Sequence, residues 1–208
     1  MHLPDPPLLV ISHRGQARWP LFEVAEAAFT GGCRWFSLRE KDLSASERRA
    51  LLAALVELGH RFGATVTAHE DIDAVGAVGA DGVHLPGKSD PAPARMRLPR
   101  ALIGVSAHSA AEAAAQLRAG ADYVTISPVF LTASKPGYGP ALGLDGLAAA
   151  AAAPGPVLAL GGVTAGNAGL CRAAGAAGVA VMGEVMRADD PQATVADLIR
   201  AFSTQTAD

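Results

Sequence analysis

The stretches GADGVHL (residues 79–85), GADYVTI (120–126) and GAAGVAVM (175–182) repeat one pattern at three places in the chain. In each, a glycine ends a predicted helix, and one or two small or acidic residues lead into a short apolar run. Such repetition indicates that the chain is assembled from similar helix–strand units. The fold class follows from extending this pattern in both directions.

Eight short apolar runs alternate with alanine-rich segments whose apolar residues recur at helical spacing. Nearly continuous hydrophobic strands separated by helices are typical of a parallel sheet covered by helices. Eight such units predict an α/β fold, a (β/α)8 TIM barrel that occupies residues 1–208 as a single domain. The alternative is an open doubly wound sheet, but no G-x-G-x-x-G follows the first predicted strand. The predicted strands are residues 8–12, 35–40, 64–70, 82–86, 101–108, 123–130, 157–162 and 178–183.

The predicted helices carry start and stop signals. Ser109 followed by Glu112 is a capping-box pattern, and Ser44 or Ser46 precedes another helix. Glycines stand where several of these helices should end. The predicted helices cover residues 20–32, 44–63, 72–79, 91–99, 109–120, 144–153 and 164–175.

The composition narrows the possible functions. Half of the 208 residues are hydrophobic, 18% are charged and the net charge is -3, so no basic face is available for a nucleic acid. The apolar run near the N-terminus is far shorter than the roughly 18 residues of a membrane span, and no basic segment precedes it. Cys33 and Cys171 are far apart and belong to no metal-binding pattern. We therefore expect a cytoplasmic protein with two buried core cysteines and neither nucleic acid nor membrane as a partner.

Polar residues gather where the predicted strands end. Because the active site of a (β/α)8 barrel lies at the carboxyl ends of its strands, residues there carry more functional weight than residues on the helices. Every cluster falls at the same end of its own strand. The residues are Arg39, Glu40 and Lys41; His69, Glu70 and Asp71; His84 and Lys88; Ser106 and His108; Thr132, Ser134 and Lys135; Gly161 and Gly162; Met182 and Gly183.

Two of these clusters suit anions. The Gly161–Gly162–Val163 turn and Gly183 can present backbone N–H groups to a phosphate. Arg39, Lys41 and Lys135 would supply cations for a more highly charged group, and Asp71 could hold a divalent metal. One weaker and one stronger anion site indicate two phosphorylated small-molecule substrates.

Plainer interpretations apply to single residues. The glycines can be required sterically by tight turns, and Arg39, Glu40 and Lys41 can be solvated surface ion pairs. His84 and His108 are more typical of hydrogen-bonded structural histidines than of catalysts.

The ordered motifs LREKD (38–42), GVSAHS (104–109), GADYVTISPVFLTASK (120–135), LGGVTAGNA (160–168) and GVAVMGEV (178–185) resemble the thiamine-phosphate synthase and thiazole tautomerase superfamily over nearly the whole chain. For a synthase, the resemblance implies coupling of hydroxymethylpyrimidine diphosphate with hydroxyethylthiazole phosphate, giving thiamine phosphate and pyrophosphate. It also implies Mg²⁺ as cofactor and self-association of the chain.

The resemblance also implies roles for individual residues. Arg39, Lys41, Lys135 and Ser106 match the catalytic residues, of which the first two contact the diphosphate. Asp71 matches the first metal carboxylate, and Asp90 takes the second metal role after a shift of one residue. The implied substrate-binding residues are Glu70, Thr132, Ser134, Gly143, Gly162, Val163 and Gly183.

Some positions depart from the synthase pattern. Glu70 stands where synthases usually have asparagine, and Ser37 replaces a usual glutamine. Tautomerases instead use a histidine where this chain has Pro128. The alternatives are therefore a thiazole phosphate tautomerase-like isomerase, with His69 or Glu70 as its base, and a non-catalytic paralogue that binds a phosphorylated metabolite.

Overall fold

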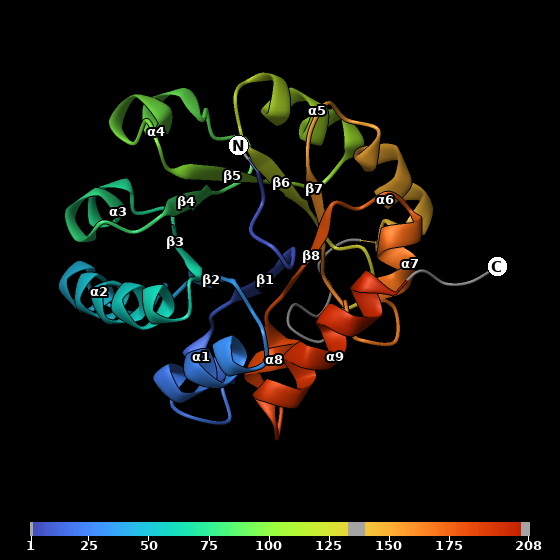
Figure 1. The fold of residues 1–208 in the computed structure, drawn as a ribbon. Coiled ribbons are helices and arrows are strands. Elements are labelled where there is room, and N and C mark those ends of the chain that lie inside the picture. The colour runs from blue at the N-terminus through green and yellow to red at the C-terminus, as the bar shows by residue number, and fades with distance from the viewer. Residues whose placement is uncertain (1, 133–139, 205–208) are drawn as a thin grey trace.

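Eight parallel strands close into a barrel in the order of the sequence, with β1 pairing with β8 (Figure 1). The computed structural model describes residues 2–132 and 140–204. The predicted (β/α)8 fold is confirmed, and the strands are shorter than predicted because the last residues of several apolar runs turn into the loops of the site. The strands are β1 (Leu8–Ile11), β2 (Trp35–Leu38), β3 (Thr65–His69), β4 (Gly82–Leu85), β5 (Leu102–Ala107), β6 (Tyr123–Ile126), β7 (Val157–Leu160) and β8 (Gly178–Val181).

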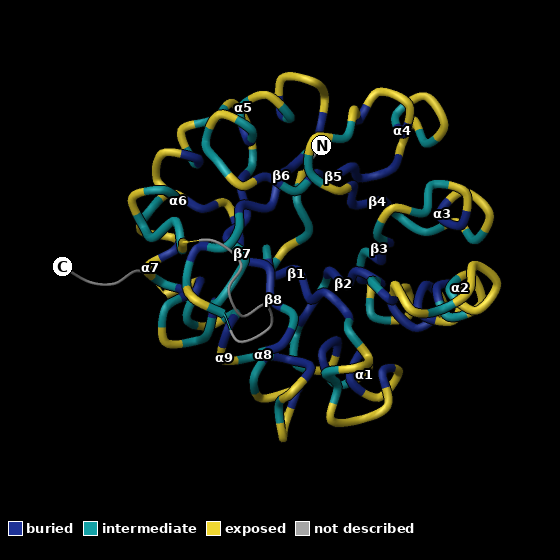
Figure 2. The backbone as a smooth tube through the Cα atoms, turned by 180° about the vertical axis from the view of Figure 1, so that it is seen from behind, coloured by how far each residue is buried: buried dark blue, intermediate teal, exposed yellow. Residues whose placement is uncertain are grey.

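Helices surround the barrel, and their exposed residues face outward while the strands are buried (Figure 2). The seven predicted helices are present, and Ser44 and Ser109 cap α2 and α5 as predicted. The helices are η1 (Arg14–Gln16), α1 (Leu21–Thr30), α2 (Ala45–Arg61), α3 (Ile72–Val78), α4 (Ala92–Arg97), α5 (Ala110–Arg118), α6 (Gly143–Ala151), α7 (Ala168–Ala173), α8 (Gly183–Met186) and α9 (Pro191–Ser203). Of these, η1, α8 and α9 were not predicted.

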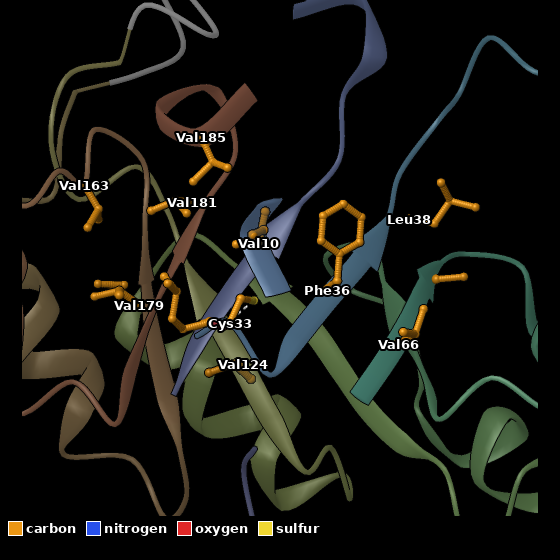
Figure 3. Close-up of a cluster of buried hydrophobic side chains, with 14 of the residues drawn as sticks. Val10, Cys33, Phe36, Leu38, Val66, Val124, Val163, Val179, Val181 and Val185 are labelled. Atoms are coloured by element: carbon orange, nitrogen blue, oxygen red, sulfur yellow. Dashed lines mark hydrogen bonds between the residues drawn. The ribbon is translucent and has the colours of Figure 1, made fainter. Parts of the chain in front are cut away.

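The outer core lies between the sheet and the helices. Figure 3 shows part of it, where Val10, Phe36 and Val66 project from three neighbouring strands. Cys33 and Cys171 are both free and buried in this layer, which confirms their predicted place in the core. Burial raises the pKa of the Cys33 thiol to about 12, so this side chain behaves as a small apolar group.

The inner core fills the barrel itself and supports the site from below. Trp35 and Tyr123 meet edge to face there, with ring centroids 4.7 Å apart. Tyr123 fits because its neighbour on β5 is Gly104, where a Cβ atom would lie 2.0 Å from the phenol ring. A glycine at this position therefore makes room for the tyrosine that reaches toward the site.

Candidate active site

A cavity of about 500 Å³ opens at the carboxyl ends of the strands. Residues in or directly after all eight strands contribute to its wall, from Ile11 at the end of β1 to Val181 at the end of β8. The predicted site residues that line this cavity are Arg39, Lys41, Glu70, Ser106, Thr132, Gly162, Val163 and Gly183. Residues far apart in the sequence thus converge on one space.

A larger hollow of about 660 Å³ lies on the opposite side, beside the starts of β3 and β5. Its wall includes Arg97 and Arg100 but none of the predicted site residues. Since barrel enzymes use the carboxyl ends of their strands, the smaller cavity is the candidate active site.

A buried carboxylate, Glu40, lies between Arg39 and Lys41 in the sequence. Glu40 is 3% exposed, and its Oε1 accepts a hydrogen bond of 2.7 Å from the Ser12 hydroxyl. Both oxygens of this carboxylate also lie 3.0 Å from the backbone N–H of Arg14. The Ser12 hydroxyl in turn accepts a 2.8 Å hydrogen bond from the Arg39 backbone N–H.

These bonds tie the loop after β1 to the loop after β2 and fix the backbone from which both cations project. A solvated surface cluster is therefore the wrong interpretation for Glu40. The interpretation as a surface ion pair is right for Lys41, whose ammonium forms an exposed 3.0 Å ion pair with Glu70.

The three predicted carboxylates have different surroundings. Glu70 lines the cavity and has a left-handed backbone with φ of 66°. Asp71 instead caps α3, accepting a hydrogen bond from the Ala74 N–H, and its other oxygen lies 3.7 Å from Arg48. Asp90 is exposed, accepts from the Ala92 N–H and lies outside the cavity wall.

Asp71 also lines a second cavity of about 540 Å³, together with Arg39, Lys41 and Glu70, whereas Asp90 lies outside both cavities. Within residues 2–132 and 140–204, no group of three His, Cys, Asp or Glu side chains could hold a metal ion. Mg²⁺ is usually held by one or two carboxylates together with substrate phosphates and water, so the metal-binding role of Asp71 and Asp90 remains a prediction.

The glycine turn after β7 is required sterically. Gly161 and Gly162 have positive φ values, and a Cβ atom on Gly162 would lie 2.5 Å from the carbonyl oxygen of Leu131. Asn167 holds the turn closed, because its amide donates to the Gly162 carbonyl at 2.9 Å and its Oδ1 accepts from the Thr164 N–H at 2.8 Å. The turn thereby keeps its backbone at the cavity wall. Its role in phosphate binding remains a prediction.

The remaining predicted positions lie outside the cavity wall or outside the described residues. Gly143 begins α6 with φ of 67°, and it is not part of the wall. Ser134 and Lys135 lie outside the described residues.

Three histidines line the cavity: His69, His84 and His108. His84 is hydrogen-bonded on both ring nitrogens, to Tyr123 and to Ser106, as expected for a hydrogen-bonded histidine. His108 also forms a hydrogen bond, from Nδ1 to the carbonyl of Ser127. The rings of His69 and His84 lie 4.8 Å apart. Burial is the main cause that lowers the pKa of both, and it brings the pKa of His84 to about 3.

Sequence reasoning missed Arg187 and Glu184, which follow β8 and also line the cavity. The Arg187 guanidinium lies where a side chain on Gly183 would be, and it donates to Gln16 Oε1 at 2.5 Å. An arginine four residues after a glycine at the end of a predicted strand was the signal that could have revealed it.

These features define a (β/α)8 barrel with a cavity at the carboxyl ends of its strands, whose wall includes Arg39, Lys41 and the glycine turn after β7. The chain belongs to the thiamine monophosphate synthase family, whose model matches residues 8–185.

Relatives from this family match almost the full length of the chain. A putative thiamine-phosphate synthase of Geobacter sulfurreducens is 40% identical over 205 residues, covering 97% of this chain and 96% of the relative. The thiamine-phosphate synthase of Chloroflexus aurantiacus is 37% identical over 200 residues, covering 95% and 93%. The solved structure of a thiamine phosphate pyrophosphorylase from Pyrococcus furiosus matches with a TM-score of 0.85 and 30% identity, covering 94% of both chains.

Proposed function

We propose that this chain is a thiamine-phosphate synthase-like transferase that couples hydroxymethylpyrimidine diphosphate with hydroxyethylthiazole phosphate. The observation that carries the proposal is the convergence of Arg39 and Lys41 with the Gly162 and Gly183 backbone on one cavity. Two anionic groups can be bound there at once, and family membership supplies the reaction.

The reaction that this site would perform begins with departure of pyrophosphate. The bond between the pyrimidine methylene carbon and the diphosphate oxygen breaks, and pyrophosphate leaves with the electron pair. The thiazole nitrogen then donates its lone pair to the pyrimidinylmethyl cation and forms the new carbon–nitrogen bond. Arg39 and Lys41 would stabilise the charge that develops on the leaving group, because cations already placed at the site need less reorganisation during the reaction.

The hydrogen bonds that join Glu40, Ser12 and the Arg14 and Arg39 backbone, here called the Glu40 clamp, support this role. They hold the Arg39 backbone before any substrate arrives. Positioning both substrates within one cavity would supply much of the remaining rate enhancement.

Lys135, Ser134, Thr132 and Gly143 complete the proposal on the β6 side. Lys135 would face the diphosphate opposite Arg39 and Lys41, and the hydroxyls of Thr132 and Ser134 would contact the thiazole phosphate. Lys135→Ala should lower the coupling rate and leave the melting temperature unchanged, because a cation that serves the substrate contributes little to the core. Unchanged turnover would remove Lys135 from the mechanism.

Magnesium belongs to the proposal through the family resemblance. Since the described carboxylates form no metal site by themselves, oxygens of the diphosphate would have to provide much of the coordination. Titration of Mg²⁺ into a chelator-treated enzyme tests this directly, with full activity in excess chelator as the contradicting result.

The isomerase alternative loses support from the state of His69. Burial, and then the nearby His84 and Arg39, lower the pKa of His69 well below its ordinary value, which makes the ring a weak base.

Incubation of the purified chain with both substrates and Mg²⁺ decides among the three functions. We expect thiamine phosphate and pyrophosphate in equal amounts. Isomerisation of the thiazole phosphate alone would show the tautomerase-like function, and binding without any conversion would show the non-catalytic one.

The proposed setting follows from the same residues. The partners would be the two phosphorylated substrates, with self-association of the chain and a cytoplasmic location that suits its free cysteines. Among the helices described, none is long and apolar enough to cross a membrane.

A further inference from the structure

A chain of hydrogen bonds crosses the barrel interior and ends at Ser106. The Tyr123 hydroxyl lies 3.0 Å from His84 Nδ1, and His84 Nε2 lies 3.0 Å from Ser106 Oγ. Tyr123 and His84 are fully buried, whereas Ser106 is partly exposed to the cavity. Thr125 makes a longer contact of 3.4 Å with the same His84 nitrogen.

His84 carries a single ring proton in this environment. Burial, followed by the positive charge of Arg39, lowers its pKa to about 3, so the ring is neutral at ordinary pH. A neutral imidazole donates from one nitrogen and accepts at the other. His84 therefore either accepts at Nδ1 and donates from Nε2, or donates from Nδ1 and accepts at Nε2.

The tyrosine proton selects between them. Burial raises the pKa of Tyr123, so its hydroxyl keeps its proton and needs an acceptor. Within the described part of the chain, His84 Nδ1 is the one hydrogen-bond partner of this hydroxyl. If Nδ1 carried the ring proton, the tyrosine proton would be buried without an acceptor, at the cost of its full desolvation. The proton of His84 must then be on Nε2.

We propose that His84 is a positioning residue that makes Ser106 a hydrogen-bond donor to the substrate. The Nε2–H of His84 donates to Ser106 Oγ, and the serine proton is left to point into the cavity. The serine proton is then available to a ligand atom that accepts a hydrogen bond, as a pyrimidine ring nitrogen or a diphosphate oxygen does. This identification of the ligand atom rests on the proposed function.

Nitrogen NMR of the labelled full chain tests the tautomer without any need for activity. Long-range proton–nitrogen spectra distinguish the Nε2–H form, the Nδ1–H form and the imidazolium, and the His84→Gln variant assigns the signal. We expect the Nε2–H form at neutral pH, and either of the other two forms would overturn the proposal. Thr125→Val should leave the tautomer unchanged.

Kinetics then separate positioning from simple space filling. His84→Gln keeps an N–H donor for Ser106, whereas His84→Met fills similar space without one. We expect kcat/KM for the diphosphate substrate to fall about tenfold further in the Met variant than in the Gln variant, the value of one hydrogen bond. In a Ser106→Ala background the two variants should be equal.

Equal losses in the parent background, or a Gln–Met difference that persists without Ser106, would show a merely structural histidine. Failure of the proposed function would look different. The parent chain would then form no thiamine phosphate, while the NMR spectrum would still report the tautomer.

Discussion

Replacement of Glu40 by glutamine tests how Arg39 and Lys41, the proposed active-site cations, are held. The change preserves the shape of the side chain but removes its charge and puts an NH₂ group in place of one carboxylate oxygen. Both carboxylate oxygens face donors in the structure. Oε1 accepts from the Ser12 hydroxyl at 2.7 Å, and both oxygens lie 3.0 Å from the Arg14 N–H. An amide oxygen at the Oε1 position can keep both donors, but the NH₂ group then takes the Oε2 position, where it faces the Arg14 N–H and cannot accept from it.

The expected loss follows from the burial of this group. A hydrogen bond to a charged group contributes about 1.5–3 kcal/mol, and Glu40 is 3% exposed, so Glu40→Gln should lower the free energy of unfolding by about 2–3 kcal/mol. Loss of the clamp should also raise the KM for the pyrimidine diphosphate and leave the KM for the thiazole phosphate nearly unchanged, because Arg39 and Lys41 project from the same loop.

Urea unfolding with linear extrapolation measures the first effect, and steady-state kinetics measure the second. Asp42→Asn is the matched control, since Asp42 pairs with the Arg14 side chain at the surface, where its carboxylate is 63% exposed. This control should unfold like the parent. Equal stability of Glu40→Gln and the parent, or equal losses in Glu40→Gln and Asp42→Asn, would refute the clamp.

Three further predictions concern the cavity and its floor. Lys41→Met should raise the KM for the diphosphate about tenfold without changing stability, because its ion pair is exposed, whereas Lys88→Met outside the cavity should change neither. Gly162→Ala should cost about 1–3 kcal/mol more unfolding free energy than Gly79→Ala in urea unfolding, because both have left-handed φ but only at Gly162 would a Cβ collide, and equal costs would contradict this. The pKa of His84 is lower in the folded protein, about 3 against 6.5, so its contribution to stability is complete above pH 6.5 and is lost as the pH falls toward 3. Between pH 7 and pH 5 this should amount to about 2 kcal/mol, and a His84→Gln variant with the same pH slope would contradict it.

The barrel could be predicted from sequence because its signal is local. Each strand is a short apolar run, and residues such as Ser44 and Ser109 mark helix starts within their own segments. The site positions could also be predicted to a useful extent, since the strand ends of a barrel meet at one face. Arg39, Ser106 and Gly162 were identified in this way, and they line one cavity.

What sequence could not reveal depends on contacts between distant segments. The burial of Glu40 requires Ser12 and the Arg14 backbone, which lie 28 and 26 residues away. The same holds for the link from His84 to Tyr123, 39 residues apart. Asp71 shows the opposite case, because a carboxylate at a strand end can cap the next helix instead of facing the site. A carboxylate that caps a helix and a carboxylate that faces the site follow a strand in the same sequence pattern.

A crystal structure of the chain with pyrophosphate tests the central claim most directly. The account predicts pyrophosphate in the cavity at the carboxyl ends of the strands, in contact with the side chains of Arg39 and Lys41. The account would be contradicted if pyrophosphate bound in the opposite hollow beside Arg97 and Arg100 and left the cavity at the carboxyl ends of the strands empty.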